Sequence, residues 1–354
     1  MTGFLPKARL KSYHNPAPML DKKRKSVDMS VYIYNSKQFK IIQGLSADLP
    51  AALDDYVNET YGSRKKASEI IEGAYFRLEK NKTLSSVKAK RIHDCWQYIK
   101  VAKHRLTHKV KLISANSCKV RLCPACAWRR MHKYAHENAK MLSNFAVYAN
   151  YHYIFLTVTI KNVKGAELSA AITDMLQAWK RMVKIRRIKP LIIGSIRNLE
   201  VTYNRKENSY HPHIHAVIAV PPSYFGADYI NQREWRYYWR EAMRINYDPR
   251  VDVRKIKDIL NDKTVFEISK YVAKISSFLD LPPAILDKVV MNLDSALNAR
   301  RIISYSGVFR QWRREQKLID DIEDGSPVEL GDEWEVFAYE WIYKARKYIQ
   351  IENN

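Results

Sequence analysis

The sequence predicts an α+β fold in which a central antiparallel sheet is flanked by helices. Two stretches with the residue types of strands lie at 155–160 and 200–220, and the second divides at a short polar turn, 205–209. Between these stretches, apolar residues recur at helical spacing over 168–183. Strands joined by a tight turn pair antiparallel, and their mixture with helices is typical of α+β domains.

Composition and charge narrow the function classes. The chain has 354 residues, 46% of them hydrophobic, which is enough for two or three packed domains. Its 61 lysines and arginines against 37 acidic residues give a net charge of +24, which favours a polyanionic partner, with nucleic acid ahead of membrane. No apolar run approaches the ~20 residues of a membrane-spanning helix, and the first residues lack a signal-peptide core. We therefore expect a cytoplasmic protein with no membrane partner.

Two predicted regions precede the strands. Residues 1–60 contain prolines, little apolar periodicity and a basic run at 22–25, so we expect a basic, flexible arm. The basic run is either a phosphate-binding segment or a solvated tail. Residues 61–147 are predicted to be a helical region, with one helix from Ser63 and another over 87–101, and this region holds the zinc site proposed below.

Two further regions follow. Residues 148–280 form the predicted α+β domain, which continues beyond the hairpin with a short strand at 251–253 and a helix from about Thr264. Residues 281–354 are predicted to be a helical C-terminal region. Its acidic segment, 319–335, has eight acidic residues and no Lys or Arg, so the rest of the molecule is more basic than the average suggests.

The four cysteines form one candidate metal site. Cys95, Cys118, Cys123 and Cys126 fall within 32 residues, and the last two flank a turn short enough for both thiolates to bind one tetrahedral ion. A reducing compartment disfavours disulfides. We predict a structural Zn²⁺ site; a redox-active pair and unligated thiols are the alternatives.

The fourth zinc ligand has two interpretations. Cys95 lies within the predicted helix 87–101, where a buried cysteine is commonly just a small apolar residue. A histidine could replace it as a ligand, and the candidates are His93, His104 and His108. Arg129 and Arg130 directly follow the cysteine segment, and we predict that they contact the DNA backbone.

The predicted hairpin carries a second candidate metal site. His211, His213 and His215 share one face of a strand because side chains alternate. If the hairpin turns about the Lys206–Glu207 bond, Glu200 lies opposite His213. Two imidazoles and one carboxylate suit a divalent cation with open positions for a substrate oxygen, and the basic charge makes a phosphate the obvious substrate. A satisfied structural histidine pair is the alternative; His211 either binds the metal or orients a neighbour.

A candidate nucleophile lies on the predicted helix that starts near Thr264. Glu267, Tyr271 and Lys274 share one face of that helix. A tyrosine has a pKa near ~10 and needs a lysine or a metal to stabilise its anion before it attacks a phosphodiester. Glu267 could then activate water as a general base. The alternatives are structural: Thr264 and Glu267 have capping-box spacing, and most of the 23 tyrosines must serve packing.

Taken together, these segments resemble the rolling-circle replication initiators of small bacterial plasmids, a branch of the HUH endonuclease superfamily. The resemblance covers roughly residues 90–310. Four stretches carry it in the family's order: the cysteine segment 118–130, the strand 155–162, the hairpin 200–215, and Glu267-x3-Tyr271-x2-Lys274. It implies that the α+β domain, 148–280, is an HUH nicking domain.

The resemblance also implies residue roles. His213 and His215 match the metal-binding pair of the HUH motif, and Tyr271 matches the nucleophile of single-tyrosine enzymes. Glu267 matches the glutamate that directs water in termination. Glu200 as the third ligand rests on the hairpin register and a looser analogy.

The implied protein is a plasmid replication initiator. It would recognise a double-stranded origin, cleave a single-stranded segment with Mg²⁺ or Mn²⁺, become linked to the 5′ phosphate, and leave a 3′-OH for the host helicase and DNA polymerase. Lys270 and Lys274 would contact the DNA backbone together with Arg129 and Arg130. A relaxase or transposase of the same superfamily, and a non-catalytic zinc-stabilised DNA-binding regulator, are the alternative functions.

Overall fold

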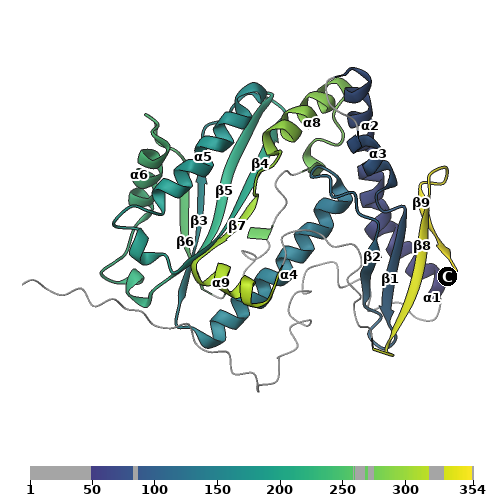
Figure 1. The fold of residues 1–354 in the computed structure, drawn as a ribbon, viewed down its shortest axis with the longest axis horizontal. Coiled ribbons are helices and arrows are strands. Elements are labelled where there is room, and N and C mark those ends of the chain that lie inside the picture. The colour runs from purple at the N-terminus through teal and green to yellow at the C-terminus, as the bar shows by residue number, and fades with distance from the viewer. Residues whose placement is uncertain are drawn as a thin grey trace, which may run out of the picture.

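The computed structural model describes residues 49–82, 87–257, 259, 268–269, 275–318 and 331–352. Within these ranges the protein has two antiparallel sheets flanked by helices, which confirms the predicted α+β class (Figure 1). None of the described helices is both long enough and apolar enough to span a bilayer.

The larger sheet has five strands in the order β6-β3-β5-β4-β7. The strands are β3 (His152–Thr159), β4 (Gly194–Asn204), β5 (Ser209–Val220), β6 (Val251–Ile256) and β7 (Ile303–Ser306). Strand β5 is central, and its second half, residues 216–220, is an apolar run that is buried on both faces. Such a run is typical of a strand that is covered on both sides.

Helices cover both faces of this sheet. One face packs against α5 (Leu168–Met182), α6 (Gln232–Met243) and α8 (Pro283–Leu297), whose apolar side chains share a core with the sheet. The opposite face packs against α4 (Pro124–Tyr148) and α9 (Gly307–Glu315). This second apolar core is the smaller of the two.

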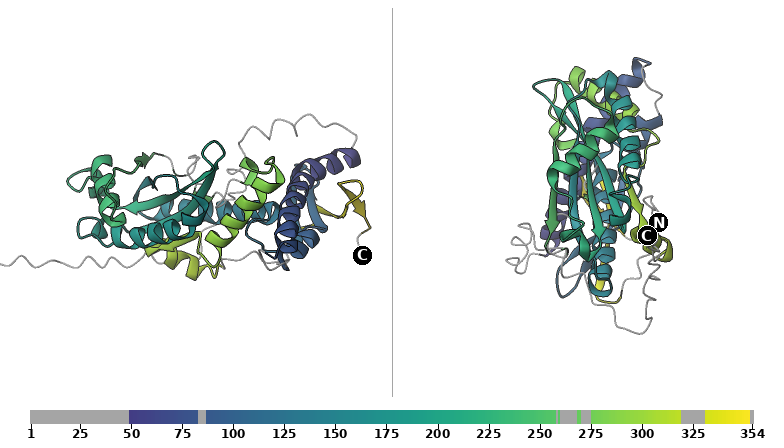
Figure 2. Two further views of the ribbon diagram at one scale, coloured as in Figure 1. Left: turned by 90° about the horizontal axis from the view of Figure 1, so that it is seen from above. Right: turned by 90° about the vertical axis from the view of Figure 1, so that its left-hand side faces the viewer.

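The smaller sheet has four strands in the order β2-β1-β8-β9. They are β1 (Tyr98–His104), β2 (Val110–Ala115), β8 (Trp334–Ile342) and β9 (Lys347–Ile351). Figure 2 shows the two sheets at opposite ends of the long dimension of the molecule. Strand β1, which begins at residue 98, and strand β9, which ends at residue 351, belong to the same four-stranded sheet.

Two helical predictions are only partly right. The helix predicted over 87–101 ends early: α3 spans Val87–Asp94, and Trp96 takes a left-handed backbone conformation, φ 56°, that terminates it. The C-terminal region predicted to be helical does contain α8 and α9, but it also contributes β7 to the larger sheet and β8 and β9 to the smaller one. Strand β8 is rich in aromatic and β-branched residues, which favour strands, but its partner β1 lies more than two hundred residues earlier.

The remaining helices lie around the smaller sheet. Helix α1 (Leu49–Val57) leads through a π-helical turn, η3 (Asn58–Gly62), into α2 (Ser63–Lys80), which packs against α3, α4 and α8. The end of the predicted flexible arm is therefore structured, and Leu53 and Val57 of α1 are buried. Residues 1–48 and 319–330 lie outside the described residues. The short 3₁₀ helices are η4 (Gly165–Glu167), η5 (Lys189–Leu191), η6 (Pro222–Phe225) and η7 (Ile275–Ser277).

Candidate functional site

The hairpin of β4 and β5 has the predicted register. Glu200 pairs with His213 and Asn204 pairs with Ser209, so the chain turns about the Lys206–Glu207 bond. The side-chain oxygen of Asn204 accepts hydrogen bonds from the backbone N–H groups of Lys206 and Glu207. This local turn chemistry aligns the two strands.

Glu200, His213 and His215 converge on one point. The Oε2 atom of Glu200 lies 3.3 Å from the Nε2 atoms of both His213 and His215. Glu200 is only 7% exposed and His213 only 9%. Because the predicted carboxylate and both predicted imidazoles meet, the sequence-derived ligand set exists as a geometric unit.

Contacts on the far side of each ring orient the two imidazoles. Nδ1 of His213 lies 3.1 Å from the carbonyl oxygen of His211, and Nδ1 of His215 lies 3.0 Å from the hydroxyl of Thr157. The His215 ring also stacks on Phe155, with 5.5 Å between ring centroids. Such outer contacts are typical of metal-binding histidines, and here they direct each Nε2 toward Glu200.

The carboxylate of Glu200 is held in its charged form. Burial would raise the pKa of Glu200, but hydrogen bonds and charge interactions with His213 and His215 outweigh burial and lower the pKa below its usual value. An anionic oxygen beside two imidazole nitrogens is a donor set for a divalent cation.

The three donor groups fit a metal ion, and His211 is not among them. One oxygen and two nitrogens lie within 4.8 Å of one another in the group Glu200, His213 and His215. The ring of His211 stacks 5.5 Å from that of His213. Burial lowers the pKa of His211 most, and the charges of His213 and Arg250 lower it further. His211 therefore lies beside the donor group and is not a member of it.

The four cysteines also converge. Sγ–Sγ distances are 3.5 Å for Cys95–Cys126, 3.6 Å for Cys118–Cys126 and 3.7 Å for Cys123–Cys95. Disulfide-bonded sulfurs would be ~2.05 Å apart, whereas four thiolates at the usual zinc–sulfur length of ~2.3 Å lie roughly 3.8 Å apart in a tetrahedron. All four thiols are free and buried, so the donor set fits a tetrahedral zinc ion.

Cys95, and no histidine, completes this group. It follows the last residue of α3, and its sulfur accepts a hydrogen bond from the N–H of Cys118. The ring of His93 instead contacts the carboxylate of Glu72, and that of His104 accepts from the N–H groups of the next turn. Among the described residues, the predicted Cys95 alternative is the one that the geometry favours.

Helix α4 begins within the cysteine group. Cys123 is its N-cap residue, Pro124 occupies the first helical position and Cys126 lies in the first turn. Burial would raise the pKa of Cys123, but hydrogen bonds from the other three thiols outweigh it and lower the pKa. A cation bound here would therefore fix the start of α4.

The predicted nucleophile segment is described only in part. Glu267, Lys270, Tyr271 and Lys274 lie outside the described residues. Two residues between them, Ile268 and Ser269, are buried: Ile268 joins the smaller core, and Ser269 accepts a hydrogen bond of 2.9 Å from Asn138 of α4. That core covers the same sheet face as the metal group, because Val217 continues the alternation of His213 and His215.

Comparison with known proteins identifies the family. A family model described as "Replication protein" matches residues 109–350. The chain belongs to this replication protein family. No solved structure matches it.

Relatives of this replication protein cover most of its length. One named Protein rep, from Bacillus amyloliquefaciens, is 33% identical over 314 residues, which are 81% of this chain and 92% of the relative. Another Protein rep, from a Bacillus species, is 36% identical over 261 residues, or 69% of this chain and 85% of the relative. A Protein rep from Staphylococcus aureus is 34% identical over 226 residues, or 63% and 96%.

Arg129 and Arg130 of the replication protein contact the chain itself. Arg129 donates to the carbonyl of Ala115 and to the hydroxyl of Ser117, and Arg130 donates to the carbonyl of Lys119. Both side chains are half-buried. Both side chains therefore stabilise the loop that carries Cys118. The predicted contact with DNA would be a second role for them.

The sequence patterns missed two buried polar residues of the replication protein, Lys65 and Asn138. Both are fully buried, and each lies on the apolar stripe of its helix. Lys65 precedes Ser68 and Ile71 at helical spacing, and Asn138 precedes Met141. The sequence signal that could have found both residues is a polar side chain at a position that helical spacing assigns to the buried face.

Proposed function

We propose that this replication protein is a plasmid replication initiator, which nicks one strand of a double-stranded origin and starts rolling-circle replication. The convergence of Glu200, His213 and His215 on a polar region of the sheet is the observation that supports the proposal most strongly. Family membership and the net charge of +24 add support, since both fit a DNA substrate.

In the proposed reaction, the phenol oxygen of a tyrosine replaces the 3′ oxygen in one phosphodiester bond of the DNA. Mg²⁺ or Mn²⁺ held by Glu200, His213 and His215 would supply a Lewis acid for the scissile phosphate. The phenol oxygen of Tyr271 loses its proton and bonds to phosphorus, and the bond from phosphorus to the 3′ oxygen breaks. The leaving oxygen takes up a proton and becomes the 3′-OH primer. The phosphotyrosine link conserves the bond energy, so the step needs no ATP.

Release of the enzyme is the role proposed for Glu267. After a round of replication this carboxylate accepts a proton from a water molecule or a hydroxyl that attacks the phosphotyrosine. The bond to Tyr271 then breaks, and the strand is released or rejoined. In the sequence, Glu267 and Tyr271 lie on either side of the pair Ile268–Ser269, which is buried and contacts the smaller core.

The remaining parts of the molecule bind DNA and stabilise the fold. Structural Zn²⁺ in the four-cysteine site would hold the start of α4, and Arg129, Arg130, Lys270 and Lys274 would contact the DNA backbone. In the cytoplasm, the origin duplex would be recognised first, and the host helicase and DNA polymerase would then act on the nicked strand.

One assay tests the proposal directly. The protein is incubated with Mn²⁺ and a supercoiled plasmid that carries its origin, and with a single-stranded oligonucleotide from that origin. We expect nicking of the plasmid and a covalent protein–oligonucleotide adduct. Tyr271→Phe should abolish both while duplex binding remains.

A second tyrosine provides the matched control. Tyr237 on α6 is 51% exposed, and Tyr237→Phe should nick at the normal rate. Nicking by Tyr271→Phe at the natural rate would reject the assignment of the nucleophile. The absence of nicking by the natural protein would instead favour a non-catalytic DNA-binding regulator.

A further inference from the structure

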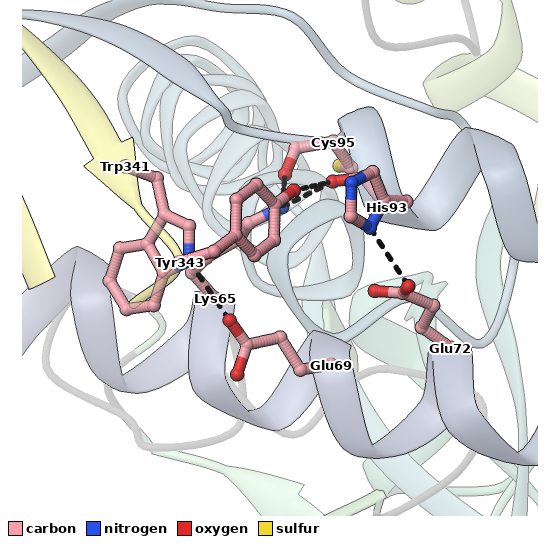
Figure 3. Close-up of polar contacts among 7 residues, drawn as sticks. All are labelled: Lys65, Glu69, Glu72, His93, Cys95, Trp341 and Tyr343. Carbon is pink, nitrogen blue, oxygen red and sulfur yellow. Dashed lines mark hydrogen bonds and ion pairs between the residues drawn. The ribbon is translucent and has the colours of Figure 1, made fainter. Parts of the chain in front are cut away.

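A fully buried lysine lies beside the four-cysteine site. Lys65, on α2, has an exposed fraction of 0%. Its ammonium group donates to the carbonyl oxygens of His93 at 2.6 Å and of Cys95 at 2.7 Å, and to the hydroxyl of Tyr343 at 3.1 Å. Figure 3 shows these partners gathered around the end of the lysine side chain.

The hydrogen-bond partners of Lys65 carry no charge. Two are carbonyls and one is a phenol, and within the described ranges no carboxylate forms an ion pair with this lysine. The two nearest glutamates on α2 bind other groups: Glu69 accepts from Trp341 and pairs with Arg346, and Glu72 contacts His93. A buried ammonium group needs a compensating negative charge nearby, because burial of an isolated charge is costly.

The four-cysteine site can supply that negative charge. Four thiolates around one divalent ion carry a net charge of −2, and all four cysteines are buried. Lys65 contacts the backbone of Cys95, one of the four ligand residues. Without the metal and with neutral thiols, the negative charges near Lys65 would be those of Glu69 and Glu72, both of which bind other groups.

A second cation makes an equivalent contact at the surface. A guanidinium nitrogen of Arg91, on α3, donates to the carbonyl oxygen of Cys118. Arg91 is exposed, so water screens its charge. The two cations together balance the −2 charge, with Lys65 as the buried member.

We propose that Lys65 is the buried counter-cation of the tetrathiolate site and strengthens the binding of Zn²⁺ there. Through Tyr343, which also donates to the carbonyl of His93, Lys65 connects the metal site to the turn between β8 and β9. It acts as a positioning residue, since it binds no metal itself.

Zinc retention by the purified full chain tests this inference. Zinc content is measured first by elemental analysis, and transfer of zinc to a chromophoric chelator is then followed in time. Lys65→Met should lower zinc affinity by about 10–100-fold, the usual effect of losing an outer contact of a metal ligand. Lys66→Met, the matched control, removes the exposed lysine that follows Lys65 on α2, and it should change the affinity by less than about threefold. Retention of zinc by Lys65→Met as tight as in the natural chain would overturn the proposal.

A second variant separates charge from hydrogen bonding. Lys65→Gln keeps a donor for the carbonyls and removes the charge, so it should lose zinc as Lys65→Met does; if Lys65→Met does not fold, this variant decides. The melting temperature is compared with and without zinc. Loss of the counter-cation should shrink the stabilisation by zinc, whereas a merely structural lysine would lower both melting temperatures equally, which would contradict the proposal.

The outcomes distinguish this inference from the assignments on which it rests. It depends on the zinc site but not on the nicking reaction. Absence of zinc from the natural chain would reject the zinc site itself, and with it the inference. Zinc in the natural chain and equal retention in Lys65→Gln would reject the role of Lys65 alone.

Discussion

At the residue scale, the sequence predicted that Glu200, His213 and His215 would lie together. It did not predict the contacts that orient the two histidine rings. The alternation of side chains and the polar turn were enough to place Glu200 opposite His213. The contact of Thr157 with His215 was not predicted, because β3 joins β5 across a connection that includes α5 and β4. Local patterns report neighbours within a hairpin, whereas contacts between distant strands depend on the whole sheet.

Removal of the Thr157 hydroxyl should weaken the hairpin metal site. Thr157→Val deletes the oxygen that lies 3.0 Å from Nδ1 of His215 and frees that ring to rotate. We expect Mn²⁺ affinity, measured by titration calorimetry, to fall by about 10–100-fold. Thr173→Val on α5 removes a hydroxyl that bonds only within its own helix and should leave the affinity unchanged. Equal affinities for the two variants would contradict this role of Thr157.

Replacement of Asn138 should lower the nicking rate and leave metal binding unchanged. Its amide donates to Ser269 at 2.9 Å and its oxygen accepts from the hydroxyl of Tyr305, so it connects α4 and β7 to the segment between Glu267 and Tyr271. Asn138→Leu should reduce the nicking rate by about tenfold or more, because a small misplacement of reacting groups is costly, while Mn²⁺ affinity and zinc content stay normal. A normal nicking rate in this variant would mean that Asn138 is only a packing residue.

At the element scale, helix α9 depends on one glycine at its start. Gly307 has φ +54°, and an added Cβ would lie 2.0 Å from the carbonyl oxygen of Ile193. Helix α9 can therefore follow β7 without a loop, and it covers the sheet face that holds the metal group. The sequence predicted a helical region here but not β7, since a four-residue strand is too short to show a period.

Replacement of Gly307 should destabilise the protein. Gly307→Ala combines a left-handed conformation with a backbone clash, and we expect the free energy of unfolding to fall by about 2 kcal/mol or more. Gly73→Ala on α2 is the control, because its Cβ would meet only the end of the Arg77 side chain. That variant should gain about 0.5–1 kcal/mol. Denaturant titration measures both, and a loss at Gly73 equal to that at Gly307 would contradict the argument.

Zinc removal should loosen the hairpin of β8 and β9 first. Tyr343 and Tyr348 attach this hairpin to the carbonyls of His93 and Trp96, which flank Cys95 in sequence. Hydrogen exchange after treatment with a zinc chelator should therefore rise in residues 334–351 before it rises in β5. Simultaneous exchange of both sheets would show that the site stabilises the whole molecule equally.

At the scale of the whole molecule, the fold class followed from the sequence and the second sheet did not. The five-stranded sheet is built mostly from consecutive segments, and its central hairpin is local. The four-stranded sheet joins β1 to β8, and no local pattern reports such a pairing. For this reason the helix predicted over 87–101 is wrong in its second half, and β8 and β9 were missed in the C-terminal region that was predicted to be helical.

The overall positive charge should make DNA binding strongly salt-dependent. With a net charge of +24, we expect several phosphate contacts, and roughly six of them would lower affinity about 10³-fold between 50 and 200 mM salt. Filter binding of origin duplex and of an unrelated duplex measures this slope. A flat salt response would mean that the basic residues do not face the DNA.

The pairing of β1 with β8 has a consequence for biosynthesis. While the ribosome makes the more than two hundred residues that separate these strands, one long edge of β1 has no partner. The hairpin of β4 and β5 is local and can form early, whereas the smaller sheet cannot be completed until β8 emerges from the exit tunnel. Chaperone binding during translation should therefore concentrate on the early segment around β1.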